Sequence, residues 1–229
     1  LTGIDALNAN GGNDTLVLTG ASTGNVSVDL QISDADQLTS SDDSPNLVQQ
    51  NFENVDASAM TGGGLIAWAK SIGSRIIGSA QDDVLHSNAG ADTLSGGGGD
   101  DTFVFNATTD LAGDSIDGGT GTDAISLDAG GAGSYDFTTA GVSISNVDKL
   151  AINANEAFTV KLSDNFNGND GNVEVVNTFG ATSAAISIDA SAFTGGTAAL
   201  NVSATNFDGA DTFIGTSNAD TINGGGGND

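Results

Sequence analysis

The sequence is short of cysteine, proline and basic residues, and each shortage excludes a class of protein. Among 229 residues there is no Cys, so neither a disulfide framework nor a Cys-based zinc site is possible. A single Pro is not the composition of a Pro-rich linker. Only four residues are basic and the net charge is -26, so repulsion from phosphate excludes nucleic acid as a partner. No apolar run is long enough to span a bilayer.

Residues for hydrolytic chemistry are also scarce. His86 is the only histidine, so a catalytic triad that used His would have to include it. We interpret His86 instead as a solvated position of a β-structure, because it ends a repeated nine-residue unit described below. The sequence therefore predicts a protein that is not an enzyme.

Aspartate and glycine are abundant. Of the 30 acidic residues 27 are Asp, and Asp favours turns and caps over helix interiors. The 34 glycines supply the positive-φ positions of tight turns. Short segments that alternate apolar and polar residues predict strands, whereas helical periodicity is absent. Four basic residues cannot neutralise carboxylates gathered in turns, so the chain needs another counter-ion.

A repeat of nine residues runs from Gly78 to Val104. Its three units place Asp at the sixth position and a large apolar residue at the eighth, as in Asp83/Leu85, Asp92/Leu94 and Asp101/Phe103. The same phase recurs before Leu16, Ile116, Ile125, Phe213 and Ile222, at Asp14, Asp114, Asp123, Asp211 and Asp220. Asp114 and Asp123 are displaced by four residues from the frame of Asp101, which predicts a bulge or loop at 106–112.

The spacing has a geometric consequence. A nine-residue unit divides into a glycine-rich turn and a short strand, so successive turns fall on opposite edges and turns 18 residues apart stack. Stacked turns can offer carboxylates and backbone carbonyls to a hard cation, which takes six to eight oxygens at about 2.3–2.6 Å. We expect three facing pairs: Asp83 with Asp101, Asp92 with Asp110, and Asp211 with Asp229.

These units resemble the glycine- and aspartate-rich nonapeptide of the RTX family of secreted bacterial proteins. The resemblance implies an all-β fold, a parallel β-roll or β-solenoid whose nonapeptide turns bind several Ca²⁺ ions. In that family the sixth-position Asp is a ligand and turn carbonyls complete the shell. The metal ligands expected here are Asp14, Asp83, Asp92, Asp101, Asp110, Asp114, Asp123, Asp211, Asp220 and Asp229, with carbonyls of Gly96, Gly98, Gly118 and Gly224. Gly-Gly is replaced by Gly-Ser at 78–79, Ser-Asn at 87–88 and Gly-Thr at 215–216, so we expect weaker binding there.

Longer matches divide the chain into two units. Asp56-Ala57-Ser58-Ala59 recurs at 189–192, an offset of 133 residues, and Ile77-Gly78 recurs as Ile214-Gly215, an offset of 137. Ile4-Asp5-Ala6-Leu7 matches 147–150 at an offset of 143. We therefore predict one β-solenoid unit at 1–126 and a second at 127–229, each ending in nonapeptides, within a fragment of a longer chain.

The mixture of nonapeptides with longer strand-rich sections is similar to RTX-containing surface-layer proteins and large adhesins. The resemblance implies a calcium-binding structural module, secreted by type I export, that folds at the bacterial cell surface when it meets extracellular calcium. Its expected partners are calcium ions and either copies of itself, in a lattice or filament, or surface glycans. The alternative is the C-terminal folding and secretion module of a secreted enzyme or toxin.

Overall fold

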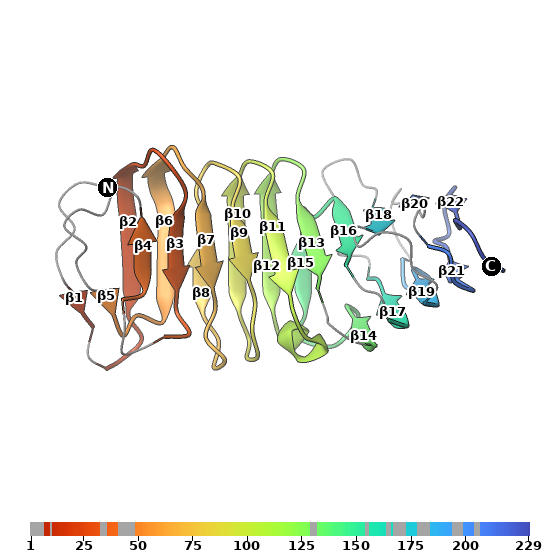
Figure 1. Cartoon of the computed structure of the whole chain (residues 1–229), viewed down its shortest axis with the longest axis horizontal. Coiled ribbons are helices and arrows are strands. Elements are labelled where there is room, and N and C mark those ends of the chain that lie inside the picture. Colours follow the sequence, from red (N-terminus) through yellow and green to blue (C-terminus); the bar gives the residue numbers. More distant parts are fainter. Residues whose placement is uncertain are drawn as a thin grey trace.

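The computed structural model of the chain is a succession of parallel coils that runs from the first coils at the left of Figure 1 to the last coils at the right. It describes residues 7–9, 11–32, 36–40, 49–128, 132–153, 156–163, 166, 173–177, 184–193, 199–203 and 207–229. Strands with buried residues at alternate positions form its sheets, as expected of strands that present one face to a core.

Three sheets build the body of the fold. The six-stranded sheet has the spatial order β15 (Ser143–Ser145), β12 (Ser115–Thr120), β10 (Thr93–Gly98), β8 (Arg75–Ile77), β6 (Asn54–Thr61) and β2 (Thr15–Ala21). The ten-stranded sheet has the order β22 (Thr221–Asn223), β20 (Leu200–Ser203), β18 (Val173–Asn177), β16 (Lys149–Ile152), β13 (Ala124–Leu127), β11 (Thr102–Phe105), β9 (Val84–His86), β7 (Leu65–Trp68), β3 (Val26–Asp29) and β4 (Leu38–Ser40). The four-stranded sheet has the order β14 (Gly133–Asp136), β17 (Phe158–Lys161), β19 (Ile186–Asp189) and β21 (Thr212–Ile214). A further parallel pair joins β1 (Leu7–Asn8) to β5 (Gln49–Gln50).

The chain alternates between facing sheets. From β6 to β13 each coil gives one strand to the six-stranded sheet and one to the ten-stranded sheet. After β13 the chain enters the four-stranded sheet with β14, and from β16 onward it alternates between the ten-stranded and four-stranded sheets. The 3-10 helix η1 (Thr108–Leu111) lies against β14, at the point where the four-stranded sheet begins (Figure 1).

Apolar side chains fill the space between the sheets in columns. On the six-stranded sheet Ile76, Leu94 and Ile116 pair in register and are buried. On the ten-stranded sheet Leu85, Phe103, Ile125 and Leu150 do the same. Five of these residues hold the eighth nonapeptide position, and Ile76 and Leu150 extend the same columns: the five are Leu85, Leu94, Phe103, Ile116 and Ile125. The repeat therefore places its large apolar residue in the core.

The predicted all-β parallel fold is confirmed. The segment 65–70, whose match to 198–203 favours a strand over a helical turn, contains strand β7. The acidic segment 33–46, with Asp34, Asp36, Asp42, Asp43 and Pro45, has the composition of a loop. That prediction is wrong in part, because β4 lies within the segment and pairs antiparallel with β3; residues 33–35 and 41–48 lie outside the described part. The four-residue displacement of Asp114 is taken up by η1, inside the predicted interval 106–112.

The ten-stranded sheet runs through the predicted boundary at 126/127, since β13 pairs with β16. The division into two units therefore remains a prediction about the sequence, whose units share one sheet. No helix among the described residues has the length and apolar character needed to cross a membrane.

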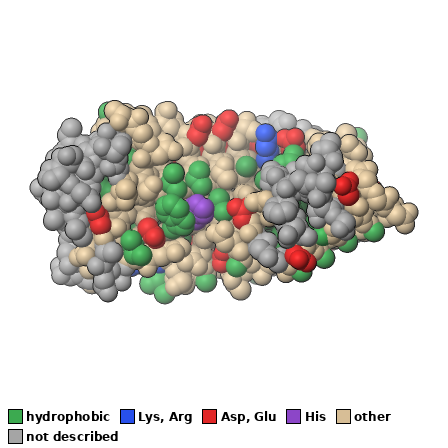
Figure 2. Space-filling view, in the orientation of Figure 1, with side chains coloured by type: hydrophobic (Ala, Val, Ile, Leu, Met, Phe, Trp, Pro, Cys, Tyr) green, Lys and Arg blue, Asp and Glu red, His purple; other side chains and the backbone are tan. Residues whose placement is uncertain are grey.

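The outer face of the ten-stranded sheet carries an aromatic pair. Trp68 on β7 stacks on His86 on β9, with ring centroids 4.8 Å apart and an interplanar angle of 11°. Both side chains are partly buried, and Figure 2 shows the histidine, in purple, beside hydrophobic side chains. His86 is therefore a half-buried residue that packs on Trp68 at this outer face, and the interpretation of a solvated position holds only in part.

Candidate metal centre

Four aspartates line the edge where the chain passes from the six-stranded to the ten-stranded sheet. We call them the acidic ladder: Asp83, Asp101, Asp123 and Asp148. Asp83 N–H donates to Asp101 Oδ1 over 2.8 Å, and Asp101 N–H donates to Asp123 Oδ1 over 2.9 Å. Asp123 N–H donates to Asp148 Oδ2 over 2.9 Å. Asp83 and Asp101 thus face each other 18 residues apart, as the spacing predicts.

The second carboxylate oxygen of the two central members has no partner. Asp101 is 1% exposed and Asp123 is fully buried, yet within the described structure neither Oδ2 atom accepts a hydrogen bond. A buried polar atom without a partner costs about 1–3 kcal/mol, and more when it carries charge. These two oxygens therefore need a positively charged partner.

Glycines bring carbonyl oxygens to the same place. A Cβ atom at Gly96 would overlap Asp101 Oδ2 and the carbonyl oxygen of Gly118. A Cβ atom at Gly118 would likewise overlap Asp123 Oδ2 and the carbonyl oxygen of Asn146. The pairing of β10 with β12 also omits the Gly96–Gly118 pair, although it includes the residues on either side. Glycine is required because carboxylate and carbonyl oxygens occupy the space that a side chain would take.

Burial and mutual repulsion disfavour the charged form of the ladder. Burial raises the pKa of Asp101 to about 8; the hydrogen bond from Asp83 N–H opposes the rise, and the charges of Asp83 and Asp123 add to it. Burial also raises the pKa of Asp123, again against a backbone hydrogen bond and with help from the charge of Asp148. A bound cation would remove this cost of ionisation.

The donor set fits calcium. Among the described residues no three His, Cys, Asp or Glu side chains come together to hold a metal by side chains alone. The ladder offers carboxylates with backbone carbonyls, all oxygen, and Ca²⁺ accepts such mixed shells with flexible geometry. Asp101, Asp123 and the carbonyls of Gly96 and Gly118 are the residues that would hold the ion. Gly98 pairs with Thr120 in the sheet, and its N–H donates to the carbonyl of Ser79.

The opposite edge has a shorter column. Ser74 N–H donates to Asp92 Oδ1 over 2.6 Å, and Asp92 N–H donates to Asp114 Oδ1 over 2.8 Å. The expected pairing of Asp92 with Asp110 is therefore wrong, because η1 lengthens this coil to 22 residues. The Asp110 carboxylate instead accepts the N–H groups of Asn106 and Ala107 and closes its own helical turn.

A serine hydroxyl lies at the centre of this second column. Ser87 Oγ is 2.9 Å from Asp92 Oδ2, 2.8 Å from Asp114 Oδ2 and 3.0 Å from the carbonyl oxygen of Asp110. Burial raises the pKa of Asp114 to about 7, opposed by hydrogen bonds from Asp92 N–H and Ser87 and strengthened by the charge of Asp92. Ser87 has one hydroxyl proton for three acceptors within reach. The carboxylates of Asp92 and Asp114 therefore meet here, and Asp110 contributes its carbonyl oxygen rather than the carboxylate that the sequence predicts.

The remaining nonapeptides lie in the last coils. Asp211 N–H donates to Asp229 Oδ1 over 3.1 Å, so these residues face each other 18 residues apart, as expected. Asp211 Oδ2 is buried and accepts no hydrogen bond from the described residues. A Cβ atom at Gly224 would meet Asp229 Oδ2. Asp220 Oδ1 accepts the N–H of Leu200 over 2.8 Å on the opposite edge.

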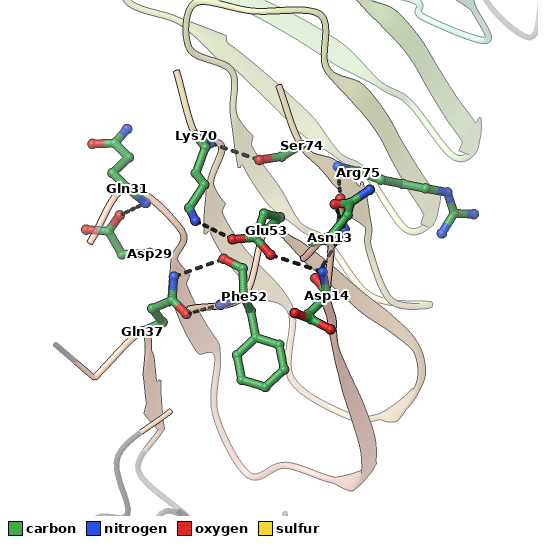
Figure 3. A network of polar contacts seen from close by, with 11 residues as sticks. Asn13, Asp14, Asp29, Gln31, Gln37, Phe52, Glu53, Lys70, Ser74 and Arg75 are labelled. Atoms are coloured by element: carbon green, nitrogen blue, oxygen red, sulfur yellow. Dashed lines mark hydrogen bonds and ion pairs between the residues drawn. The ribbon is translucent and has the colours of Figure 1, made fainter. Parts of the chain in front are cut away.

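Asp14 lies in the first coils, beside a basic residue. Its N–H donates to Glu53 Oε2 over 3.0 Å, and Glu53 Oε1 forms an ion pair with Lys70 Nζ at 2.7 Å (Figure 3). Burial alone would raise the pKa of Glu53, but the hydrogen bonds from Asp14 N–H and Lys70 lower it overall. Asp14 Oδ2 is buried without a hydrogen-bond partner in the described part of the chain. This end of the solenoid thus combines an ammonium group with one candidate ligand.

Sequence reasoning missed two kinds of residue. Asp148 is not among the predicted ligands, although Leu150 follows it in the same phase as Ile125 follows Asp123. That phase was the available signal. The hydroxyls of Ser79 and Thr216 were noted only as departures from Gly-Gly, and each donates to the Asp of its own turn. No sequence rule gives the direction of such a hydroxyl.

Comparison with protein-family models finds the RTX calcium-binding nonapeptide repeat in four copies, at residues 1–20, 74–107 and 205–229. No curated protein and no solved structure matches the chain. The matched segments contain the Asp101 turn and the Asp211–Asp229 coils, whereas Asp110, Asp114 and Asp123 lie outside them. The chain therefore carries RTX repeats, and these form a calcium-binding structural module.

Proposed function

We propose that this chain of RTX repeats is a structural module of a secreted bacterial cell-surface protein, of the surface-layer or adhesin type, that folds when it meets extracellular calcium. The observation that supports the calcium step is the pair of buried, unpartnered oxygens Asp101 Oδ2 and Asp123 Oδ2 beside inward carbonyls. Calcium supplies the positive charge that four basic residues cannot give to 30 acidic ones.

The residues of the ladder prepare the site for the ion. One oxygen of each carboxylate is held by the N–H of the preceding coil, which fixes the position of the other oxygen. The buried apolar columns exclude water from the core side of the acidic ladder. A site filled at a hundredfold excess of calcium over its dissociation constant stabilises the folded state by about 2.7 kcal/mol. Extracellular modules have dissociation constants of about 10⁻⁴–10⁻³ M, so millimolar calcium outside the cell fills them, whereas cytosolic calcium does not.

The surface role is supported by the architecture. Coils with glycine-rich turns alternate with coils that lack them, and all share one continuous ten-stranded sheet. Such quasi-one-dimensional stacking suits an extended structural element, and we propose assembly with further copies of the chain at the cell surface. A secretion module of an enzyme or toxin would share the calcium chemistry, so the substitution of calcium ligands described below tests calcium binding in both roles. Assembly is tested separately, by sedimentation of the chain with and without calcium.

The test replaces both central ladder aspartates. Asp101→Asn with Asp123→Asn removes the unpartnered anionic oxygens while each side-chain carbonyl can still accept its backbone N–H. We expect fewer calcium ions bound per chain in isothermal titration calorimetry and a smaller rise in stability on adding calcium. The matched control is Asp82→Asn with Asp100→Asn, which removes the same charge from exposed residues that also accept backbone N–H groups. The control should bind as the unchanged chain does. The proposed function is contradicted if the unchanged chain binds no calcium. It is also contradicted if circular dichroism and light scattering show that the unchanged chain is compact and β-rich in EDTA.

A further inference from the structure

We infer that the turns at Ser79 and Thr216 are closed by a hydroxyl group in place of a metal ion. The inference rests on the proposed calcium function and assigns the calcium to the glycine turns. It makes Ser79 and Thr216 the residues that decide which turns take no ion.

The two turns have the same hydrogen bonds. Ser79 N–H donates to Asp83 Oδ2 over 2.6 Å, and Ser79 Oγ donates to Asp83 Oδ1 over 3.0 Å. Thr216 N–H donates to Asp220 Oδ2 over 2.8 Å, and Thr216 Oγ1 donates to Asp220 Oδ1 over 2.7 Å. Each hydroxyl also accepts the N–H of the residue two positions later, Gln81 or Asn218. Both oxygens of each carboxylate are therefore satisfied by the protein.

Glycine occupies the same position in the next two turns of the ladder. Gly97 and Gly119 have φ angles of +106° and +100°, in the region that side chains rarely adopt. Asp101 and Asp123 follow them, and their Oδ2 atoms accept no hydrogen bond in the described structure. Ser79 and Thr216 are not among the residues with positive φ. The two kinds of turn thus differ in backbone conformation, and they also differ in whether both carboxylate oxygens accept hydrogen bonds.

A hydroxyl turn and a glycine turn cannot both bind a cation in the same way. In a hydroxyl turn two protons point at the carboxylate, where a cation would need free lone pairs and would repel those protons. In a glycine turn the hydroxyl is absent and the glycine N–H does not donate to the carboxylate, so the anionic oxygen is left for a cation. Ser79 is 4% exposed and Asp83 is 1% exposed, so water does not replace either donor.

The hydroxyl turn also supports the first glycine turn. Asp83 N–H donates to Asp101 Oδ1, and the carbonyl oxygen of Gly96 lies against Gly78. A turn complete without metal therefore positions a ligand of the next turn. The matching order Ile77-Gly78-Ser79 and Ile214-Gly215-Thr216 places such a turn at corresponding positions of the two sequence units.

The experiment converts each hydroxyl turn into a glycine turn. Ser79→Gly and Thr216→Gly remove the hydroxyl and allow positive φ, whereas Ser79→Ala and Thr216→Ala remove the hydroxyl but disfavour positive φ. Calcium bound per chain is measured by isothermal titration calorimetry and by equilibrium dialysis with ⁴⁵Ca. We expect each Gly variant to bind one more ion than the unchanged chain and each Ala variant to bind the same number.

Two outcomes overturn the inference: an unchanged stoichiometry in both Gly variants, or an equal gain in the Ala variants. Failure of both Gly variants to fold at saturating calcium also overturns it, because the ion would then be unable to replace the hydroxyl. A chain that binds no calcium before any substitution contradicts the proposed function instead, so the two failures are distinguishable.

Discussion

At the scale of single residues, an aspartate of the acidic ladder has two separate tasks. One oxygen accepts a backbone N–H and so joins neighbouring coils, and the other faces either a protein donor or the place of a cation. The residue two positions into the turn decides between these states. The sixth-position Asp alone therefore does not report whether a turn needs calcium.

His86 gives a pH dependence that is separate from the metal sites. Burial lowers the pKa of its ring below 6.5, and the charge of Asp128 opposes that shift in part. Because the folded state holds the proton less tightly than the unfolded chain, stability is present above pH 6.5 and is lost as pH falls through the lowered folded pKa. Trp68 is the only tryptophan and stacks on this ring, so its fluorescence reports the titration.

We expect Trp68 fluorescence to change with a midpoint below pH 6.5 in calcium-saturated protein. Asp128→Asn should lower this midpoint further, and His86→Gln should abolish the transition. A midpoint above 6.5 would contradict the burial of the ring.

At the scale of strands, register is kept while turn length varies. The connection from Asp83 to Asp101 spans 18 residues, and those from Asp92 to Asp114 and from Asp123 to Asp148 span 22 and 25. The apolar columns stay aligned because a shift by one residue would turn every core side chain outward. Extra residues are placed in turns or in η1, where longer loops cost little entropy.

The central column should therefore dominate stability. Ile125 is fully buried in β13, whereas Ile222 on β22 is 42% exposed. We expect Ile125→Ala to lower the free energy of unfolding by about 2–5 kcal/mol and Ile222→Ala to lower it by less than about 1 kcal/mol. Guanidinium denaturation in saturating calcium measures both. Equal effects would show that the columns are not the main source of stability.

At the scale of the whole molecule, charge and core oppose each other. A net charge of -26 favours an expanded chain, and the buried columns favour a stack of coils. Screening by monovalent salt weakens repulsion between exposed carboxylates but leaves the buried ladder oxygens without a partner. A cation bound in the turns is needed both to reduce the repulsion and to give the buried ladder oxygens a partner.

The choice of ion is the test at this scale. We expect millimolar Ca²⁺ to reduce the hydrodynamic radius and raise the strand content, because it accepts irregular shells of oxygen. Mg²⁺ at the same concentration should do neither, because it demands near-octahedral geometry and loses water reluctantly. NaCl at about 1 M, where the Debye length is about 3 Å, is the control for screening. Equal compaction by all three salts would mean that charge neutralisation alone folds the chain.

The sequence by itself determined the repeat, its strands and most candidate ligands. Asp at the sixth position and an apolar residue at the eighth predict both the turns and the core columns, because strand periodicity and turn chemistry are local properties. The facing pairs Asp83–Asp101 and Asp211–Asp229 follow from spacing alone where the coil has 18 residues.

Only the tertiary structure decided the other pairings. Asp114 replaces Asp110 opposite Asp92 because η1 packs against β14 and takes up four residues. Asp148 joins the ladder because β16 pairs with β13 across a long connection. The closure of the Ser79 turn depends on the direction of one hydroxyl and one N–H, which the coil geometry sets and composition does not. Contacts between neighbouring coils thus determine which aspartates face each other, and the hydrogen bonds within each turn determine which carboxylates are left for calcium.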